Sequence, residues 1–442
     1  MEEKTTSENM GAEGAGRRQF LKTSLSAVLG AIGAATAEGF TARDVMARTH
    51  EEFPVPLSDD FAPLHQRNLV LTRAYGKLDP HLANLAFTKY KKQPPKPVPG
   101  YSQLDFALAV GGWAIMKHVA PFDSGGFGDH GIVSWDRYDY KKYETRHEFA
   151  SRTAASAAIK KAAEIYGAIL CGVARRDPRW DYAGFYDAKT KTDYGWEKFP
   201  FKPKSVIVMA VPMDYHSITA SPAWTASGTV GTGYSRMILT AAAMAQFIRG
   251  LGYNAIPAGN SLGNSVAYGI LAGLGEGGRA GGIIVPKHGP RVRLCKVYTD
   301  FDFVEYDKPM TFGVASFCER CKRCADACPA GAISKDDKPS FGPTYTDDPE
   351  KSWNNQKGVL KYYSDSKKCF EFWAENGTEC NNCIAACPYN KPDFWHHRLV
   401  DYMNTVVPGP LHSFMREMDI AFGYGSVSNP DAVKKFWSTM EG

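Results

Sequence analysis

The cysteines near the C-terminal end of this chain follow a spacing that few structures can satisfy. The first group reads Cys318-x2-Cys321-x2-Cys324-x3-Cys328, followed by Pro329. This is the spacing of bacterial two-cluster ferredoxins, in which the fourth cysteine binds the other 4Fe–4S cluster of the pair. Zinc also accepts four thiolates, but a zinc site requires neither this spacing of the cysteines nor the Cys-Pro ending. The pattern therefore favours iron–sulfur clusters over zinc or disulfides.

A second cysteine group is one ligand short. It reads Cys380-x2-Cys383-x3-Cys387, again followed by proline, and a regular run would have its first cysteine at Gly377. Cys369, eleven positions before Cys380, is the nearby thiolate that can fill the vacancy. Because the last cysteine of each group crosses over, two ligand sets are predicted. They are Cys318, Cys321, Cys324 and Cys387 for one 4Fe–4S cluster, and Cys328, Cys369, Cys380 and Cys383 for the other.

The N-terminus predicts where the protein works. Residues 16–22 read Gly-Arg-Arg-Gln-Phe-Leu-Lys, a twin-arginine export signal, and an apolar stretch and a small-residue cleavage site follow, up to residue 37. A basic start to an amphipathic helix is the alternative, and the Phe-Leu-Lys after the arginines disfavours it. This route carries folded, cofactor-loaded proteins, so the export signal is consistent with a protein that receives its iron–sulfur clusters before export. Cys171 and Cys295 lie in apolar runs and are expected in the core.

Composition excludes some classes of function. The formal net charge is +5, from 52 basic and 47 acidic residues without a basic block, so no nucleic-acid partner is expected. After the signal, no apolar segment approaches the ~20 residues that span a bilayer. We expect a protein at the outer face of the cytoplasmic membrane, attached peripherally.

The chain reads as several segments. Residues 38–100 look polar and irregular and end in a proline-rich surface strap. From about residue 150, helices and strands alternate, which predicts a layered α/β core. We expect helices over 154–166, 234–251 and 265–274, and strands over 168–174, 205–211, 254–257, 282–285 and 294–298. A solvated insertion is expected at 335–357, and helices with a glycine-rich turn in the tail 396–442.

Short motifs after the export signal, most of them before the cysteine groups and one in the tail, resemble those of respiratory reductive dehalogenases, the corrinoid and iron–sulfur enzymes of organohalide respiration. They are residues 233–237 (Gly-Tyr-Ser-Arg-Met), 247–249, 251–257 (Leu-Gly-Tyr-Asn-Ala-Ile-Pro), Asn260, 272–275, 289–294 (Gly-Pro-Arg-Val-Arg-Leu), 297–300 (Val-Tyr-Thr-Asp), 308–309, 312–314 and 423–425. Each motif is weak alone, but their order is specific. The pattern is most similar to tetrachloroethene reductive dehalogenases.

The resemblance implies an α+β fold, in which a nitroreductase-like α/β corrinoid-binding core precedes a C-terminal ferredoxin-like two-cluster domain. The implied segments are a signal at 1–37, a substrate- and corrinoid-capping region at 38–149, the core at 150–305, the cluster domain at 306–395 and a helical tail at 396–442. It also implies base-off cobalamin without a protein ligand, because the chain has no Asp-x-His-x-x-Gly motif and His130 directly follows Asp129.

Three catalytic residues follow from the same resemblance. Tyr234, at the expected start of a helix, would donate the proton, and Arg293 would stabilise the phenolate and the departing halide. Asn260 would orient the tyrosine or the substrate. Without the resemblance, each of the three is an ordinary packing, turn or surface residue. Arg291 has no counterpart and is expected to be an exposed strand residue.

Other residues are assigned on weaker grounds. Trp373 matches a family tryptophan near the corrinoid, and Gly275 and Gly277 would let the backbone approach the corrinoid. This glycine-rich stretch follows a helix, so it does not fit a dinucleotide site. Trp113 and Trp135 are weaker candidates for a substrate wall, with core packing the preferred interpretation. The pair His396 and His397 is expected at the surface or at a helix cap.

The predicted function is a two-electron, one-proton replacement of carbon-bound halogen by hydrogen at a cobalamin cobalt. Whether cobalt attacks carbon or binds halogen stays open at this point. Expected partners are a small organohalide, with chlorinated aliphatics favoured, a small integral-membrane anchor subunit and a quinone-linked electron donor. The alternatives are an exported electron-transfer subunit without corrinoid, and an enzyme similar to epoxyqueuosine reductase, which the export signal disfavours.

Overall fold

A four-stranded antiparallel sheet forms the centre of the protein. The computed structural model describes residues 48–119, 142–188, 190–348, 351–392 and 410–438, so the predicted signal, Trp135 and His396–His397 lie outside the described residues. The strands lie in the order β2-β5-β9-β6. Their bounds are Leu170–Arg175 for β2, Ser205–Pro212 for β5, Val292–Thr299 for β9 and Ala255–Ala258 for β6. These four predicted strands are confirmed.

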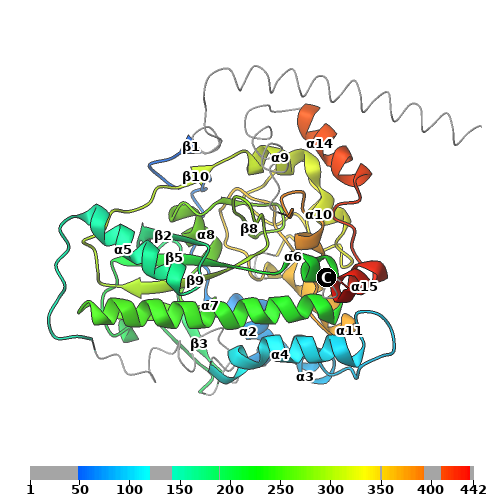
Figure 1. Cartoon of the computed structure of the whole chain (residues 1–442), viewed down its shortest axis with the longest axis horizontal. Coiled ribbons are helices and arrows are strands. Elements are labelled where there is room, and N and C mark those ends of the chain that lie inside the picture. The colour runs from blue at the N-terminus through cyan, green and yellow to red at the C-terminus, as the bar shows by residue number, and fades with distance from the viewer. Residues whose placement is uncertain (1–47, 120–141, 189, 349–350, 393–409, 439–442) are drawn as a thin grey trace, which may run out of the picture. The chain divides into compact units, whose positions relative to one another are not determined.

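Helices cover both faces of this sheet. Because side chains alternate along a strand, Ile207 and Met209 of β5 face one core cluster, whereas Val206 and Val208 face another. The first cluster packs under α5 (Arg152–Ile165) and α7 (Trp224–Gly250), and the second packs under α8 (Ser265–Leu271). Figure 1 shows α7 running along the sheet, with α5 beside it. The layered α/β core is as predicted, and α5 and α8 lie close to their predicted positions.

Helix α7 begins ten residues before its predicted start, at Trp224 rather than Tyr234. Its first part contains Gly228, Gly231 and Gly233, which disfavour a helix in isolation. Gly228 and Gly231 let α4 (Gln103–Val119) pack closely against α7, and this tertiary contact overrides the local preference. Tyr234 therefore lies inside a helix and not at its beginning, so that expectation was wrong.

The region before the core is more structured than its composition indicated. It contains the helices α2 (Val70–Tyr75) and α3 (Pro80–Thr88) in addition to α4. Helix α3 begins at an Asp79 cap followed by proline. The apolar sides of α2 and α3 pack on α11 (Ser366–Asn376), nearly 300 residues later, so sequence-local patterns could not reveal them. Residues 94–99 are exposed, in agreement with a surface strap.

Short helices carry the cysteine motifs. They are α9 (Val314–Cys321), α10 (Arg323–Asp326), α11 and α12 (Asn382–Ala385). The insertion at 335–357 was expected to be solvated, but Trp353 and Gln356 within it are buried. Helices α14 (Pro410–Ala421) and α15 (Pro430–Ser438) flank a turn with Gly423 and Gly425, as predicted for the tail.

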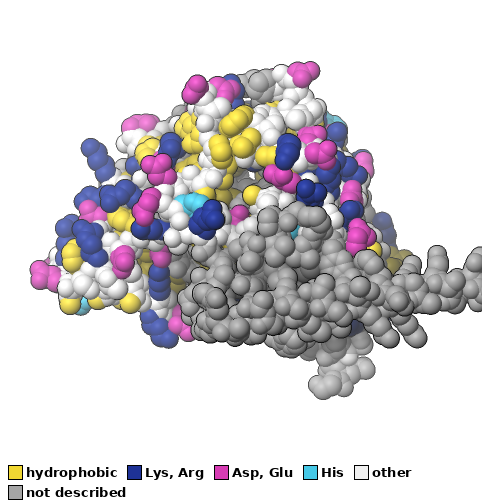
Figure 2. Space-filling model, turned by 90° about the horizontal axis from the view of Figure 1, so that it is seen from above, with side chains coloured by type: hydrophobic (Ala, Val, Ile, Leu, Met, Phe, Trp, Pro, Cys, Tyr) yellow, Lys and Arg dark blue, Asp and Glu magenta, His cyan; other side chains and the backbone are white. Residues whose placement is uncertain are grey.

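Smaller elements complete the described fold. They are β1 (Arg48–Thr49) paired with β10 (Met310–Thr311), β3 (Phe185–Asp187) with β4 (Thr192–Tyr194), β7 (Glu276–Gly277) with β8 (Ile283–Ile284), helix α6 (Tyr215–Thr219), and 3-10 turns at Gln66–Asn68 and Trp196–Lys198. In Figure 2, acidic and basic side chains are mixed over the described part of the visible face. No helix in the described ranges is long and apolar enough to cross a membrane.

The contact between α4 and α7 gives a stability test. A methyl group on Gly112 would press against the backbone oxygen of Gly228, whereas one on the adjacent Gly111 would meet open space. We expect Gly112→Ala to lower the free energy of unfolding by about 1–3 kcal/mol. Gly111→Ala should instead leave it unchanged or raise it by up to about 1 kcal/mol, because alanine is the better helix former. Denaturant unfolding of both variants measures the difference, and equal stabilities would contradict the close packing.

Candidate active site

The eight motif cysteines form two groups, in which Cys321 is buried and the other seven are partly buried. Burial, followed by the neighbouring sulfurs of Cys318, Cys324 and Cys321, raises the pKa of the Cys387 thiol well above its usual value. Burial and then the sulfurs of Cys383, Cys380 and Cys328 do the same to the pKa of Cys369. The sulfurs that act on these two thiols thus belong to the predicted ligand set of each, although Cys383 of the other set also acts on Cys324. These neighbours are consistent with the interleaved sets that the spacing predicts, with Cys369 beside Cys328, Cys380 and Cys383.

The spacing of these thiols suits clusters better than a single ion. Among the described residues, no three His, Cys, Asp or Glu side chains surround a point where one metal ion would sit. A 4Fe–4S cluster places an iron between each cysteine and the centre, so its ligands stand farther apart than those of tetrahedral zinc. Buried thiols with raised pKa values would be relieved by binding iron as thiolates. The donor sets therefore fit two clusters.

Tyr234, Asn260 and Arg293 meet near one end of the strands of the central sheet, where β9 begins and β6 ends. Tyr234 comes from α7, Arg293 from β9, and Asn260 follows β6. The amide nitrogen of Asn260 donates a hydrogen bond of 3.2 Å to the Tyr234 hydroxyl. The guanidinium carbon of Arg293 lies 4.6 Å from the centre of the Tyr234 ring, so the cation covers the ring face. The three residues chosen from sequence are thus in mutual contact.

A tryptophan from the N-terminal region covers the other face of the tyrosine. Trp113 stacks on Tyr234 with ring centres 5.1 Å apart and an interplanar angle of 23°. The ammonium of Lys91 lies 3.6 Å from the centre of the Trp113 ring. Lys91, Trp113, Tyr234 and Arg293 therefore form one stack with a cation at each end. The sequence did not single out Lys91, and it assigned Trp113 to core packing, although Trp113 also forms part of the site.

A buried carboxylate holds this stack in place. Glu379 accepts hydrogen bonds from the Trp113 indole (3.0 Å) and the Ser227 hydroxyl (2.5 Å), and its other oxygen pairs with Lys91 at 3.0 Å. Burial acts to raise the pKa of Glu379, but Lys91 and these hydrogen bonds hold it below the usual value. Glu379 directly precedes Cys380, so the same turn supports the tyrosine stack and a cluster ligand. In the sequence, the position of Glu379 directly before a cysteine motif was the one signal that could have identified it as a site residue.

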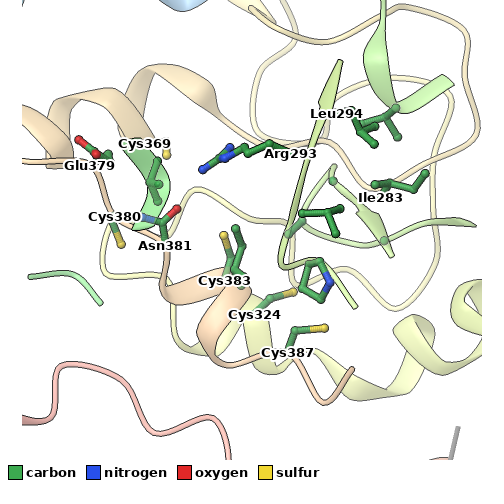
Figure 3. Close-up of a pocket in the computed structure, with 18 of the residues that line it drawn as sticks. Ile283, Arg293, Leu294, Cys324, Cys369, Glu379, Cys380, Asn381, Cys383 and Cys387 are labelled. Carbon is green, nitrogen blue, oxygen red and sulfur yellow. The ribbon is translucent and has the colours of Figure 1, made fainter. Parts of the chain in front are cut away.

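The tyrosine stack and all motif cysteines except Cys328 border one cavity of about 440 Å³. In Figure 3, Arg293 extends toward Cys369, and Cys380, Asn381 and Cys383 lie beside it. The other lining residues include Leu71, Tyr75, Tyr90, Lys91, Trp113, Lys117, Val230, Tyr234, Asn260, Ser265, Val266, Gly278, Arg279, Gly282, Ile283, Pro290, Val292, Leu294, Trp373 and Tyr389. Residues of the core, the region before it and the cluster segment thus enclose one space.

Two sequence-based expectations about this cavity need correction. Gly275 is buried against the backbone of Ile284 in the β7–β8 hairpin and Gly277 is exposed, so neither lines the cavity, whereas Gly278 and Gly282 do. Arg291 is not an exposed strand residue. It is 7% exposed and donates to Asn390 and to the backbone oxygen of Met213, which ties β9 to the chain after the last cysteine.

Three polar atoms on the cavity wall have no hydrogen-bond partner among the described residues. They are Arg293 Nε, Trp373 Nε1 and Asn381 Nδ2, and all three are buried. Buried donors without partners are costly, so a polar ligand in the cavity would satisfy them. The cavity thus combines apolar walls with unpaired donors, as a large amphipathic cofactor would need.

Comparison with known proteins gives a family for this chain. Residues 317–391 match the 4Fe-4S dicluster domain family. The chain is 37% identical over 413 residues to a tetrachloroethene reductive dehalogenase of Desulfitobacterium hafniense, covering 77% of this chain and 73% of that protein. The chain belongs to the reductive dehalogenase family.

Other reductive dehalogenases extend the comparison. The tetrachloroethene reductive dehalogenase of Sulfurospirillum multivorans is 36% identical over 297 residues, 61% of this chain and 57% of that protein. The solved structure of the catabolic reductive dehalogenase NpRdhA superposes with a TM-score of 0.67 at 21% identity, covering 87% of this chain and 50% of that one. The reductive dehalogenase fold is therefore shared, although this chain spans only half of that solved protein.

Replacement of Cys369 tests the ligand sets in this dehalogenase. We expect Cys369→Ala to disturb only the cluster of Cys328, Cys380 and Cys383, lowering the iron content from about eight to about four or five per chain. Cys171→Ala, which removes a cysteine outside both sets, should keep all the iron. Iron analysis and electron paramagnetic resonance spectra measure both. An unchanged iron content in Cys369→Ala would refute the assignment.

Proposed function

We propose that this dehalogenase replaces a carbon-bound halogen of a small organohalide by hydrogen, as a terminal reductase of organohalide respiration. The reaction consumes two electrons and one proton and releases halide. The observation that carries the proposal is the common cavity: in a member of this family, a tyrosine held by an asparagine and an arginine borders the same space as cysteines of both four-cysteine sets.

The cavity residues fit a base-off corrinoid cradled by a nitroreductase-like core. One solved structural neighbour is a reductive dehalogenase whose structure suggests a mechanism for B12-dependent dehalogenation by that protein. When bound, the corrinoid cobalt would supply the low-potential electrons that break the carbon–halogen bond. Trp373, Asn381 and the backbone at Gly278 and Gly282 would contact it.

Tyr234 would deliver the proton. Asn260 holds the hydroxyl through the hydrogen bond from its amide, and the stack between Trp113 and Arg293 fixes the plane of the ring. Loss of the proton leaves a phenolate, which the guanidinium of Arg293 stabilises across the ring face. Where a bound cofactor and substrate exclude water from the cavity, this interaction would be stronger than in solution. A fixed donor beside a fixed cation is an arrangement suited to general acid catalysis.

The two cysteine sets would pass electrons to the cavity one at a time. Arg293 is among the groups that act on the Cys383 thiol, so the set of Cys328, Cys369, Cys380 and Cys383 adjoins the tyrosine stack. The other set starts on α9, whose residues Ala315, Ser316 and Arg320 are exposed. We therefore assign the cluster of Cys328, Cys369, Cys380 and Cys383 as the inner cluster. The cluster of Cys318, Cys321, Cys324 and Cys387 is the outer cluster, which would receive electrons from the donor.

Substrate and partners are part of the same proposal. The relatives named for tetrachloroethene support a small chlorinated aliphatic substrate, and an apolar cavity with few polar groups suits such a molecule. The twin-arginine motif at residues 16–22 supports export to the outer face of the cytoplasmic membrane. A small membrane anchor and a quinone-linked donor would complete the electron path.

Replacement of Tyr234 by phenylalanine tests the proposed chemistry. Tyr234→Phe should slow chloride release from tetrachloroethene, driven by reduced viologen, by about 10²–10⁴-fold, because the proton donor is lost while the stacked ring remains. Corrinoid and iron contents should not change. Tyr253→Phe serves as the control, because Tyr253 packs on Phe301 and does not line the cavity. Full activity of Tyr234→Phe would exclude it as the obligatory acid.

A further inference from the structure

The β7–β8 hairpin of the core holds helix α9 at both ends. Glu276 accepts hydrogen bonds from the backbone N–H groups of Phe312, Val314 and Ala315 at the beginning of the helix. Three residues later, Arg279 donates to the backbone oxygen of Cys318 in the second half of the helix, at 3.0 Å and 2.8 Å. A carboxylate at the start and a cation near the end complement the helix dipole. The hairpin thus fixes the helix that carries Cys318 and Cys321.

Arg279 is a buried cation with an unusual set of partners. Its side chain is 2% exposed and bonds only to backbone oxygens: besides Cys318, those of Ser334, Asp336 and, at 3.5 Å, Glu319. Its guanidinium carbon lies 3.6 Å from the centre of the Tyr362 ring. No ion pair joins Arg279 to a carboxylate anywhere in the described ranges.

The carboxylates nearest in sequence to these contacts are engaged elsewhere. Asp337 pairs with Lys322 and Glu319 pairs with Lys338, whereas Asp336 accepts from Ser334 and Thr344. Asp337 and Asp336 interact electrostatically with Arg279 without forming an ion pair with it, and both are exposed to solvent, where this interaction is screened. Glu276 is buried but directs its oxygens at the start of α9. Carbonyl dipoles and one aromatic ring therefore surround a full positive charge.

A buried charge without an opposite charge is strongly disfavoured, and a second charged group normally compensates it. The group next to Arg279 that would become anionic in the loaded protein is the set of Cys318, Cys321, Cys324 and Cys387, which borders the same cavity as Arg279. Four thiolates around an iron–sulfur core carry net negative charge, and one electron more when the cluster is reduced. The buried cation therefore has its natural partner in this cluster.

We propose that Arg279 is the counter-charge of the outer cluster and raises its reduction potential. The cation stabilises the reduced cluster more than the oxidised one, because reduction adds one negative charge at a fixed distance from the guanidinium. The inner cluster adjoins Arg293 instead, so each cluster would have its own arginine. The inference rests on the proposed iron–sulfur relay and is independent of the halogenated substrate.

Redox titration of the anaerobically purified full-length protein, followed by electron paramagnetic resonance, tests this role. Arg279→Gln removes the charge and keeps part of the carbonyl contacts, Arg279→Lys keeps the charge with fewer contacts, and Lys338→Gln removes an exposed lysine from the same segment. We expect the potential of the outer cluster to fall in Arg279→Gln and to stay near the wild-type value in Arg279→Lys and Lys338→Gln. The inner cluster serves as an internal reference in every sample.

Each outcome has a distinct meaning. An unchanged outer potential in Arg279→Gln with all iron retained overturns the proposal, as does an equal fall in Arg279→Gln and Arg279→Lys, which would indicate a purely structural contact. If Arg279→Gln does not retain iron, Arg279→Lys decides: a wild-type potential supports the proposal and a lowered one contradicts it. A wild-type protein without iron would instead defeat the proposed relay itself.

Discussion

The placement of seven cysteine sulfurs around one cavity, with Cys328 behind them, is the constraint on which the rest of the structure depends. Burial and the neighbouring sulfurs raise the pKa values of thiols in both sets, so the arrangement holds donors that metal binding would relieve. The helices that carry these cysteines are short, with α10 and α12 spanning four residues each. They cannot be stable alone. They are held by longer elements, since α2 and α3 pack on α11 and the β7–β8 hairpin holds α9.

The cluster segment and the tyrosine stack are built as one unit. Glu379 supports Trp113 and Lys91, and the residue that follows it is a predicted cluster ligand. Arg293 covers the tyrosine ring and also lies near Cys383. A substitution in the cluster segment would therefore also affect the tyrosine stack, and a substitution in the stack would affect the cluster segment. This coupling is the physical basis for proposing that electrons and the proton reach one substrate in one closed space.

Sequence patterns predicted much of this, and the gaps have physical reasons. The cysteine spacing predicted both sulfur sets, because ligand geometry restricts local sequence, and apolar periodicity located β2, β5, β9 and α5. The resemblance supplied Tyr234, Asn260 and Arg293, which composition alone could not separate from ordinary residues. Lys91 and Glu379 were missed, and Trp113 was assigned to the core in preference to a substrate wall, because these residues are joined only by contacts between distant segments. The same holds for α2, α3 and the early start of α7, where packing overrides local preference, and for Arg291, whose buried partners come from another segment.

Metal analysis of the anaerobically purified full-length protein tests the central claim most directly. The account predicts one corrinoid cobalt together with about eight irons per chain, since the cavity joins two four-thiolate sets to a site with unpaired donors. Eight irons without cobalt would contradict it and would leave an electron carrier with a tyrosine stack of unexplained purpose.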